Sequence, residues 1–315
     1  MDLKKKIAIG TGIFAVTTLT LHIINKYIQI DVSQNKSLDY IPDLYYNWKF
    51  GEISYTKKGS GESILLIHDL TTYSSGYEWH KVVDELSKSN TVYCIDLLGC
   101  GNSDKPNLLY TNYLYVQLIT DFIKNVIGDK TTVISTGESS SFVLAACSNN
   151  SEIINKIIMI NPMDMNILTK SPSKLSTLVT KIINLPVFGT FLYNIFSSRK
   201  KVNSLFKTDY YSNYTFEDDE DAKIYYESAH TEGSKYLFAS LAGFYTTLNI
   251  LHCVKSLHND ITIIVGNDLE EYKDIAEEYQ DIIPYVKIHK INDTKYLPQL
   301  EKPEEVSDII KRAIV

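Results

Sequence analysis

The chain lacks the cysteine patterns that build a disulfide framework or a metal site. Its 315 residues include four cysteines, and none forms a Cys-x-x-Cys pair or stands at metal-ligand spacing from a histidine. Cys94 and Cys147 lie in apolar runs, which is typical of small buried side chains. We therefore expect no disulfide, no metal site and no cofactor.

Patterns typical of nucleic-acid binding are missing too. The formal net charge is −7, and no basic block is interleaved with aromatic residues, so we expect no nucleic-acid partner. The chain also has no internal repeat and no low-complexity tract. With 44% hydrophobic and 22% charged residues, its composition is that of a globular protein able to bury a substantial core.

Charge is also absent from a long stretch near the N-terminus, which runs from Ile7 to Asn25 behind three consecutive lysines. A membrane-spanning helix needs about 20 such residues, and no small-x-small cleavage site follows the run. We predict that residues 1–30 form a single-pass membrane anchor. The three lysines favour a cytoplasmic N-terminus, but Lys26 dilutes that asymmetry and leaves the side of the membrane open.

The alternative for this segment is an amphipathic helix packed on the domain. Residues 31–49 are polar and are interpreted as a linker. We place the folded domain at residues 50–315.

Within that domain, short apolar runs alternate with segments of helical periodicity. Strands that are uniformly apolar and separated by helices predict a mostly parallel, doubly wound α/β sheet covered on both faces. The alternation stops at Pro162 and resumes at residue 261, so residues 163–257 are predicted to be a helical insertion between two strands. The predicted strands are residues 52–58, 63–69, 91–96, 131–136, 156–162, 261–266 and 285–291.

Four motifs occur in a fixed order along these elements. They are "LLIHD" at 65–69, "DLLGCGNSDKP" at 96–106, "GESSS" at 137–141 and "LPQLEKPEEV" at 297–306. In this order and spacing the chain resembles the capped, single-domain type of the α/β-hydrolase fold family, over roughly residues 50–315. The resemblance implies that the insertion at 163–257 is a cap that shapes a substrate pocket.

The resemblance also implies roles for individual residues. Ser139 would be the nucleophile on a sharp strand-to-helix turn, and the amides of Ser140 and Leu70 would form the oxyanion hole. The alternative is that Ser139 is only a small residue that lets the strand and helix pack closely. Asp69 and Ser141 replace family glycines. His68 is read as structural.

The position that the family gives to its general base is occupied by Tyr296. A tyrosine, with a pKa near 10, cannot accept a serine proton at neutral pH as an imidazole does. His230 in the cap and His289 in the last strand are the alternative bases.

The catalytic acid has two candidates. Asp268 is the first, and Asp164 is the alternative acid.

Three functions follow as expectations. The first is a membrane-anchored serine hydrolase with a degenerate triad, acting on a small-molecule or lipid-like ester. The second is a non-catalytic protein of this fold that binds a ligand or partner in the capped pocket. A different reaction on the same scaffold, such as proton transfer or lyase chemistry, is a third. Because the base is missing, we expect weak or undetectable turnover of simple esters.

Overall fold

The computed structural model describes residues 3–34, 44–215, 219–255 and 257–314. One eight-stranded sheet has the order β1-β2-β4-β3-β5-β6-β7-β8. The first two strands pair antiparallel, β2 also runs antiparallel to β4, and all other neighbours are parallel, which confirms the predicted sheet. The strands are β1 Leu44–Trp48, β2 Gly51–Lys58, β3 Glu62–Ile67, β4 Asn90–Ile95, β5 Thr131–Thr136, β6 Ile154–Ile160, β7 Asp260–Gly266 and β8 Lys287–Ile291.

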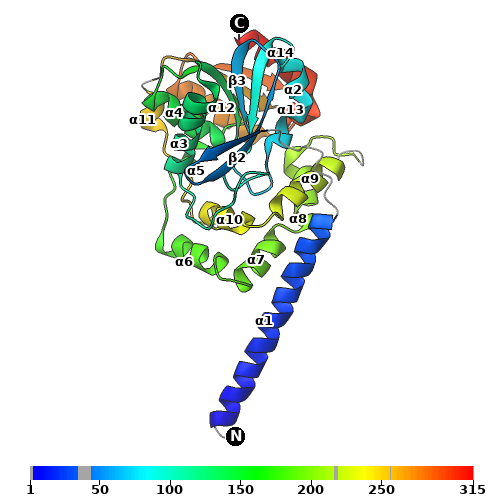
Figure 1. Cartoon of the computed structure of the whole chain (residues 1–315). Helices are drawn as coiled ribbons and strands as arrows, with labels where there is room; N and C mark the ends of the chain where they lie inside the picture. Colours follow the sequence, from blue (N-terminus) through cyan, green and yellow to red (C-terminus); the bar gives the residue numbers. More distant parts are fainter. Residues whose placement is uncertain (1–2, 35–43, 216–218, 256, 315) are drawn as a thin grey trace.

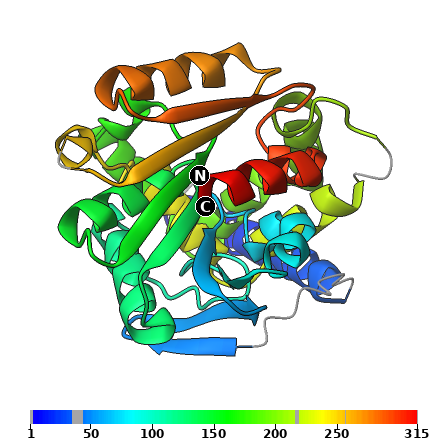
Figure 2. The same ribbon diagram turned by 90° about the horizontal axis from the view of Figure 1, so that it is seen from above.

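Helices cover both faces of the sheet because alternate strand residues point to opposite sides (Figure 2). Leu65 and Ile67 of β3 pack in the larger core, with helices α3 (Asn112–Phe122), α4 (Ser139–Asn149) and α12 (Glu270–Ile282). Ile64 and Leu66 of the same strand face the other core, with α2 (His80–Leu86) and α14 (Pro303–Ile314). The short helix α13 (Pro298–Glu301) precedes α14.

The chain between β6 and β7 forms a cap in which the described residues contain helices and no strand, as the sequence predicts (Figure 1). A tyrosine-rich cluster, which includes Tyr77, Tyr210, Tyr225 and Tyr296, packs the cap on the body. The cap helices are α5 Met165–Leu168, α6 Lys174–Ile183, α7 Phe188–Phe196, α8 Arg199–Leu205, α9 Asp219–Ala229, α10 Ser234–Ala242 and α11 Leu251–Val254. Shorter turns of other helical type are Gly76–Trp79, Ile123–Ile127 and Phe206–Tyr210.

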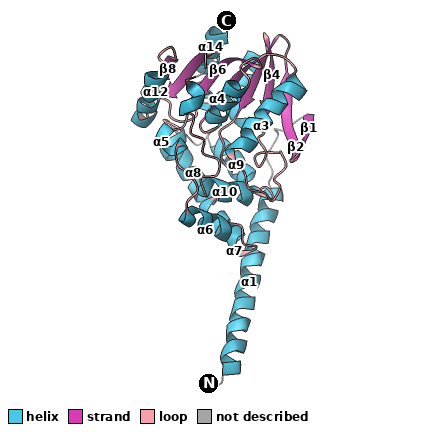
Figure 3. Ribbon diagram, turned by 90° about the vertical axis from the view of Figure 1, so that its left-hand side faces the viewer, coloured by secondary structure: helices cyan, strands magenta, loops and turns pink. Residues whose placement is uncertain are grey.

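The N-terminal helix α1 (Leu3–Gln34) projects from the body beside α7 (Figures 1 and 3). Asn25 Nδ2 donates to the carbonyl oxygen of Val187 at 2.9 Å, and Asn194 Nδ2 donates to Asn25 Oδ1 at 3.0 Å. Among the described residues, no single helix has the length and the apolar character to cross a membrane. The single-pass anchor therefore stays a prediction.

The predicted linker at residues 31–49 does not match the structure at either end. Helix α1 continues to Gln34, and strand β1 already belongs to the sheet, where the Trp48 Nε1–H donates to Asp121 Oδ2 at 2.9 Å. Residues 35–43 lie outside the described part of the chain. The strand was missed because β1 is an edge strand that is largely exposed, so its sequence carries little apolar pattern.

Candidate active site

The turn between β5 and α4 lies at the carboxyl end of the sheet, beneath the cap. Strand β5 pairs with β6 as far as Thr136, and the N–H of Gly137 donates to the carbonyl oxygen of Ile160 at 3.1 Å. Gly137 has a φ of 57°, and α4 begins at Ser139. Glycine enters left-handed backbone without steric penalty, so Gly137 is the residue on which the chain reverses. The apex therefore lies two residues before the predicted nucleophile.

Ser139 is a fully buried residue of the first helical turn. Its hydroxyl donates to the carbonyl oxygen of His68 at 2.7 Å, and a carbonyl cannot activate it as a base. The N–H of Ser140 donates to the Gly137 carbonyl oxygen at 3.2 Å, so it does not point to an oxyanion site. The structure thus corrects both assignments and favours the alternative, in which Ser139 is a small packing residue.

Two other amides converge as oxyanion-hole donors would. The N–H groups of Leu70 and Glu138 donate to one oxygen, Asp69 Oδ1, at 2.8 and 2.9 Å. They come from the loop after β3 and from the residue after the turn apex, the two places from which α/β-hydrolases draw these donors. The Leu70 amide, which the resemblance assigns to the oxyanion hole, and the Glu138 amide thus both bond to a carboxyl group of the chain itself.

The second oxygen of this carboxyl group also has a partner. The hydroxyl of Tyr296 donates to Asp69 Oδ2 at 2.7 Å. A Cβ atom at Gly137 would lie 2.2 Å from Asp69 Oδ1 and 2.2 Å from the Tyr296 hydroxyl oxygen. The space that a nucleophile side chain needs is thus taken by the Asp69–Tyr296 pair.

Three buried acidic side chains surround this turn: Asp69, Glu78 and Glu138. Burial, assisted by the nearby Asp69 carboxyl, raises the pKa of Glu78 to about 8, and burial raises the pKa of Glu138 to about 8. Burial also raises the pKa of Asp69, although the hydrogen bonds from Tyr296 and from the Glu138 and Leu70 amides oppose that shift. Glu78 Oε1 accepts from Gln299 Nε2 at 3.1 Å.

Tyr296 cannot serve as a general base in this setting. Burial, and then the charge of Asp69, raises its pKa well above the ordinary value. Its ring stacks on Tyr210 with centroids 5.3 Å apart and contacts Tyr272 at the same separation. The tyrosine is thus held as a hydrogen-bond donor to Asp69.

The predicted acids do not join this group. Asp268 is exposed and hydrogen-bonds to the hydroxyl of Ser212. Asp164 caps α5, where its Oδ1 accepts from the N–H of Asn166 at 2.6 Å. Neither carboxyl bonds to Tyr296 or Ser139 among the contacts of the described residues.

The alternative bases are placed elsewhere as well. His230 is buried in the cap, with Nδ1 2.8 Å from the Tyr226 carbonyl oxygen and Nε2 3.3 Å from the Ser197 hydroxyl. His289 lies on β8 opposite Ile264. His68 bridges two backbone groups: its Nδ1 lies 2.7 Å from the Asp69 carbonyl oxygen, and its Nε2 accepts from an amide. The described residues thus contain no Ser–His–acid arrangement at the turn.

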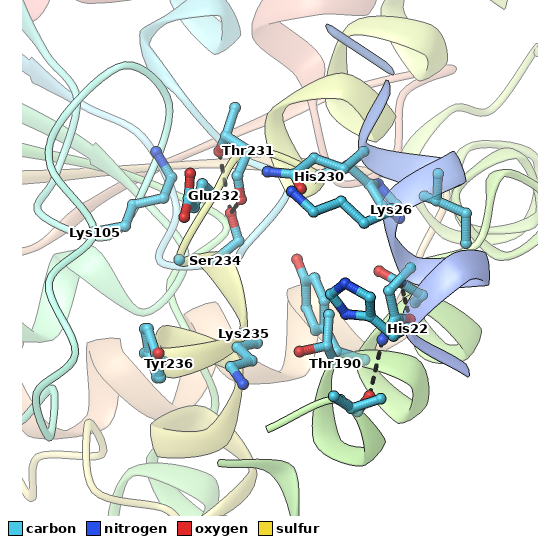
Figure 4. Close-up of a pocket in the computed structure, with 17 residues that line it drawn as sticks. His22, Lys26, Lys105, Thr190, His230, Thr231, Glu232, Ser234, Lys235 and Tyr236 are labelled. Carbon is cyan, nitrogen blue, oxygen red and sulfur yellow. Dashed lines mark hydrogen bonds between the residues drawn. The ribbon is translucent and has the colours of Figure 1, made fainter. Parts of the chain in front are cut away.

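A cavity of about 440 Å³ lies between α1 and the cap, away from this turn (Figure 4). Its walls carry an excess of basic side chains in a chain whose net charge is negative. The charged and imidazole-bearing side chains on its wall are Lys26, Lys105, Lys235, His22, His230 and Glu232. In the part of the chain that the structure describes, no group of three or more His, Cys, Asp or Glu side chains is arranged to hold a metal ion.

The chain belongs to the α/β-hydrolase fold family, whose model matches residues 62–300. One segment is 28% identical over 111 residues to a 2-hydroxy-6-oxo-6-(2'-aminophenyl)hexa-2,4-dienoic acid hydrolase of Metapseudomonas resinovorans, covering 34% of this chain and 38% of that protein. Another relative, a soluble epoxide hydrolase of Corynebacterium sp., is 25% identical over 107 residues, covering 34% and 37%. The matches thus span less than two fifths of these relatives' lengths.

Solved structures share the fold at low sequence identity. A serine hydrolase involved in carbazole degradation superposes with a TM-score of 0.71 at 18% identity, covering 86% of this chain and 97% of that one. A membrane phospholipase A superposes with a TM-score of 0.67 at 15% identity. That comparison covers 99% of this chain and 98% of the phospholipase, so it extends over the N-terminal helix as well.

Proposed function

We propose that the chain is a non-catalytic α/β-hydrolase-fold protein that is held at a membrane through α1. The observation that carries this proposal is the Asp69 carboxyl group, which accepts both converging amides of Leu70 and Glu138. An oxyanion hole stabilises a reaction only if its donors are free to meet the negative charge that develops on the substrate. Here they are already engaged by an internal group.

Acyl transfer also needs a nucleophile and a general base, and the turn supplies neither. Gly137 supplies no nucleophile at the turn apex, and Tyr296 replaces the imidazole that would accept a proton. The three residues that differ from the family pattern, Asp69, Gly137 and Tyr296, contact one another, because Asp69 and Tyr296 occupy the space above Gly137. The site is therefore a stable polar cluster rather than a partly damaged triad.

Hydrolase names among the relatives support descent from an enzyme. If the chain were itself an ester hydrolase, its substrate would be a small-molecule or lipid-like ester, and Ser139 would have to leave its hydrogen bond to the His68 carbonyl. In the described part of the chain, no hydrogen bond joins the Ser139 hydroxyl to a side chain that could act as its base.

A ligand role is supported by the cavity between α1 and the cap. Lys26 of α1 and Lys235 of α10 both line this cavity, and burial lowers the pKa of the Lys235 ammonium group. A partly buried cation favours an anionic partner, so the ligand proposed for this cavity carries a negative charge.

Membrane attachment is supported by the outer part of α1. Ile13, Phe14 and Leu19 are 63%, 73% and 60% exposed, respectively. Soluble monomers seldom leave a contiguous apolar surface of this kind uncovered. The likeness to a membrane phospholipase A over nearly the whole chain agrees with this proposal.

The test is ester turnover by the full chain, assayed with short and long acyl esters. We expect no turnover above the buffer rate for the wild type and the same result for Ser139→Ala. A triple variant that carries Gly137→Ser, Asp69→Gly and Tyr296→His restores the family residues at these three positions and serves as the gain-of-function arm. Turnover by the wild type that disappears in Ser139→Ala would show that the chain is a serine hydrolase.

A further inference from the structure

Helix α6 turns two hydroxyl groups and Ile183 toward the protein and leaves its leucines outward. The Thr180 hydroxyl donates to the carbonyl oxygen of Ala239 at 2.9 Å, and the Ser176 hydroxyl donates to that of Gly243 at 3.2 Å. On the opposite side, Leu175 is 72% exposed and Leu178 is 53% exposed. A helix on a water-facing surface has the reverse arrangement, with its apolar stripe toward the core.

The outward apolar side chains continue from α6 onto α7. Together they form a surface that we name the cap face, and each of its members is more than a third exposed. The cap face consists of Leu175, Leu178, Val179, Leu185, Phe188, Ile195 and Phe196. Exposed apolar groups gathered in this way mark an interaction site.

The segment that carries the cap face has charge of one sign. Between residues 165 and 208 the chain has seven basic residues and no acidic one, although acidic residues outnumber basic residues 38 to 31 in the whole chain. The seven are Lys170, Lys174, Lys181, Arg199, Lys200, Lys201 and Lys207. Basic side chains beside an apolar surface complement anionic lipid headgroups, which attract lysine and arginine.

The position of α1 fixes the orientation of the cap face. Helices α6 and α7 lie at the end of the body from which α1 projects (Figures 1 and 3). The hydrogen bonds that join α1 to α7 involve Asn25, where the uncharged run from Ile7 ends. That run would be about 28 Å long at 1.5 Å per residue, close to the thickness of a bilayer's hydrocarbon core. A bilayer that holds the run would meet the cap at the level of α7.

We propose that the cap face lies on the surface of an anionic lipid bilayer, with the side chains of α6 and α7 inserted among the headgroups. This inference rests on the proposed membrane attachment through α1 and adds a second, peripheral contact. The bilayer is favoured over a second copy of the chain because the surrounding basic residues would repel their counterparts across a symmetric interface. In this orientation the amino ends of the parallel strands point away from the membrane.

The experiment uses the full chain with Cys253→Ser, because Cys253 is half-buried whereas the other three cysteines are buried. Three variants of this chain, Phe14→Cys, Leu178→Cys and Lys130→Cys, each carry an environment-sensitive fluorophore on the introduced thiol. Lys130 is exposed and precedes β5, at the end of the sheet opposite the cap. The protein is reconstituted into vesicles of phosphatidylcholine and phosphatidylglycerol, with and without lipids that bear a nitroxide quencher.

We expect the nitroxide lipids to quench the labels at residues 14 and 178 by at least about twofold, and to leave the label at residue 130 unchanged. Quenching at residue 178 should fall when phosphatidylglycerol is omitted. Quenching at residue 14 without quenching at residue 178 would overturn the cap contact and leave the α1 attachment standing. Quenching at neither position would refute both. Shielding of residue 178 that grows with protein concentration, without lipid quenching, would assign the cap face to a second copy instead.

Discussion

The inner and outer sides of the cap differ in which side chains they leave without partners. Beneath the cap, Asp69 is buried with a hydrogen-bond donor on each carboxyl oxygen, and Gly137 leaves the space in which that carboxyl group sits. On the outer side, α6 turns its hydroxyl groups inward and leaves leucines uncovered. The inner site is thus complete without a ligand, whereas the cap face is not. We infer that this protein acts through its outer surfaces rather than through its ancestral active site.

Gly137→Ser should give the largest effect, because its side chain would meet Asp69 and Tyr296 at 2.2 Å on a backbone with a φ of 57°. We expect a loss of roughly 4 kcal/mol or more in the free energy of unfolding, measured by chemical denaturation. Gly128→Ala is the matched control, since Gly128 has a φ of 77° and open space around it; it should cost only about 1 kcal/mol. Equal losses in the two variants would contradict a filled site.

Asp69→Ala should have the next largest effect. It leaves the Leu70 and Glu138 amides and the Tyr296 hydroxyl without their acceptor, so we expect a loss of roughly 3 kcal/mol in denaturation experiments. Asp69→Asn retains one oxygen for the two amides and should lose only about 1 kcal/mol. If Asp69→Ala were as stable as the wild type, the carboxyl group would not be satisfying these donors.

The stability of the fold should depend on pH through the buried carboxyl groups. The pKa of Glu138 in the folded chain is raised to about 8 from 4.5, so the folded state binds more protons than the unfolded state between these values. The free energy of unfolding should therefore fall as pH rises through this window. Between pH 5 and pH 9 we expect the Glu138→Gln variant to lose less stability than the wild type, by roughly 1 to 3 kcal/mol.

The control for this pH series is Glu62→Gln, because Glu62 is exposed at the start of β3. That variant should follow the wild-type curve at both pH values. A Glu138→Gln curve parallel to that of the wild type would show that Glu138 does not take up a proton on folding.

Ser139→Ala should give the smallest effect. It removes one buried hydrogen bond, from the Ser139 hydroxyl to the His68 carbonyl oxygen, and should cost about 1 kcal/mol in thermal or chemical denaturation. Ser141→Ala removes a similar bond, to the Glu138 carbonyl oxygen at 2.8 Å, and should cost about the same. A much larger effect of the Ser139 change than of the Ser141 change would indicate a special role for that hydroxyl.

Much of the fold could be predicted from the sequence because buried parallel strands are continuous apolar runs. The runs at 131–136 and 261–266 coincide with β5 and nearly with β7. The edge strand β1 could not be found, since an exposed edge leaves little apolar pattern.

The nucleophile position predicted from the motif, Ser139, lies two residues beyond the turn apex at Gly137, and the reason is local. In both "STGES" and "GESSS" a small residue stands two positions before and two positions after the centre, so the motif alone fits either Gly137 or Ser139. The β5–β6 pairing through Thr136 decides between them, and that pairing is a contact between distant parts of the chain. The same holds for Asp69 and Tyr296, which are 227 residues apart in sequence and meet only in the fold. A substitution at one member gives no hint of its partner.

The most direct test of a filled, nucleophile-free site is the intact mass of the full chain after incubation with a fluorophosphonate probe, which reports an activated serine. We expect the unmodified mass for the wild type, because Gly137 stands at the turn apex and the Leu70 and Glu138 amides are engaged by Asp69. A stoichiometric adduct that peptide mapping assigns to Ser139, and that is absent in Ser139→Ala, would contradict it.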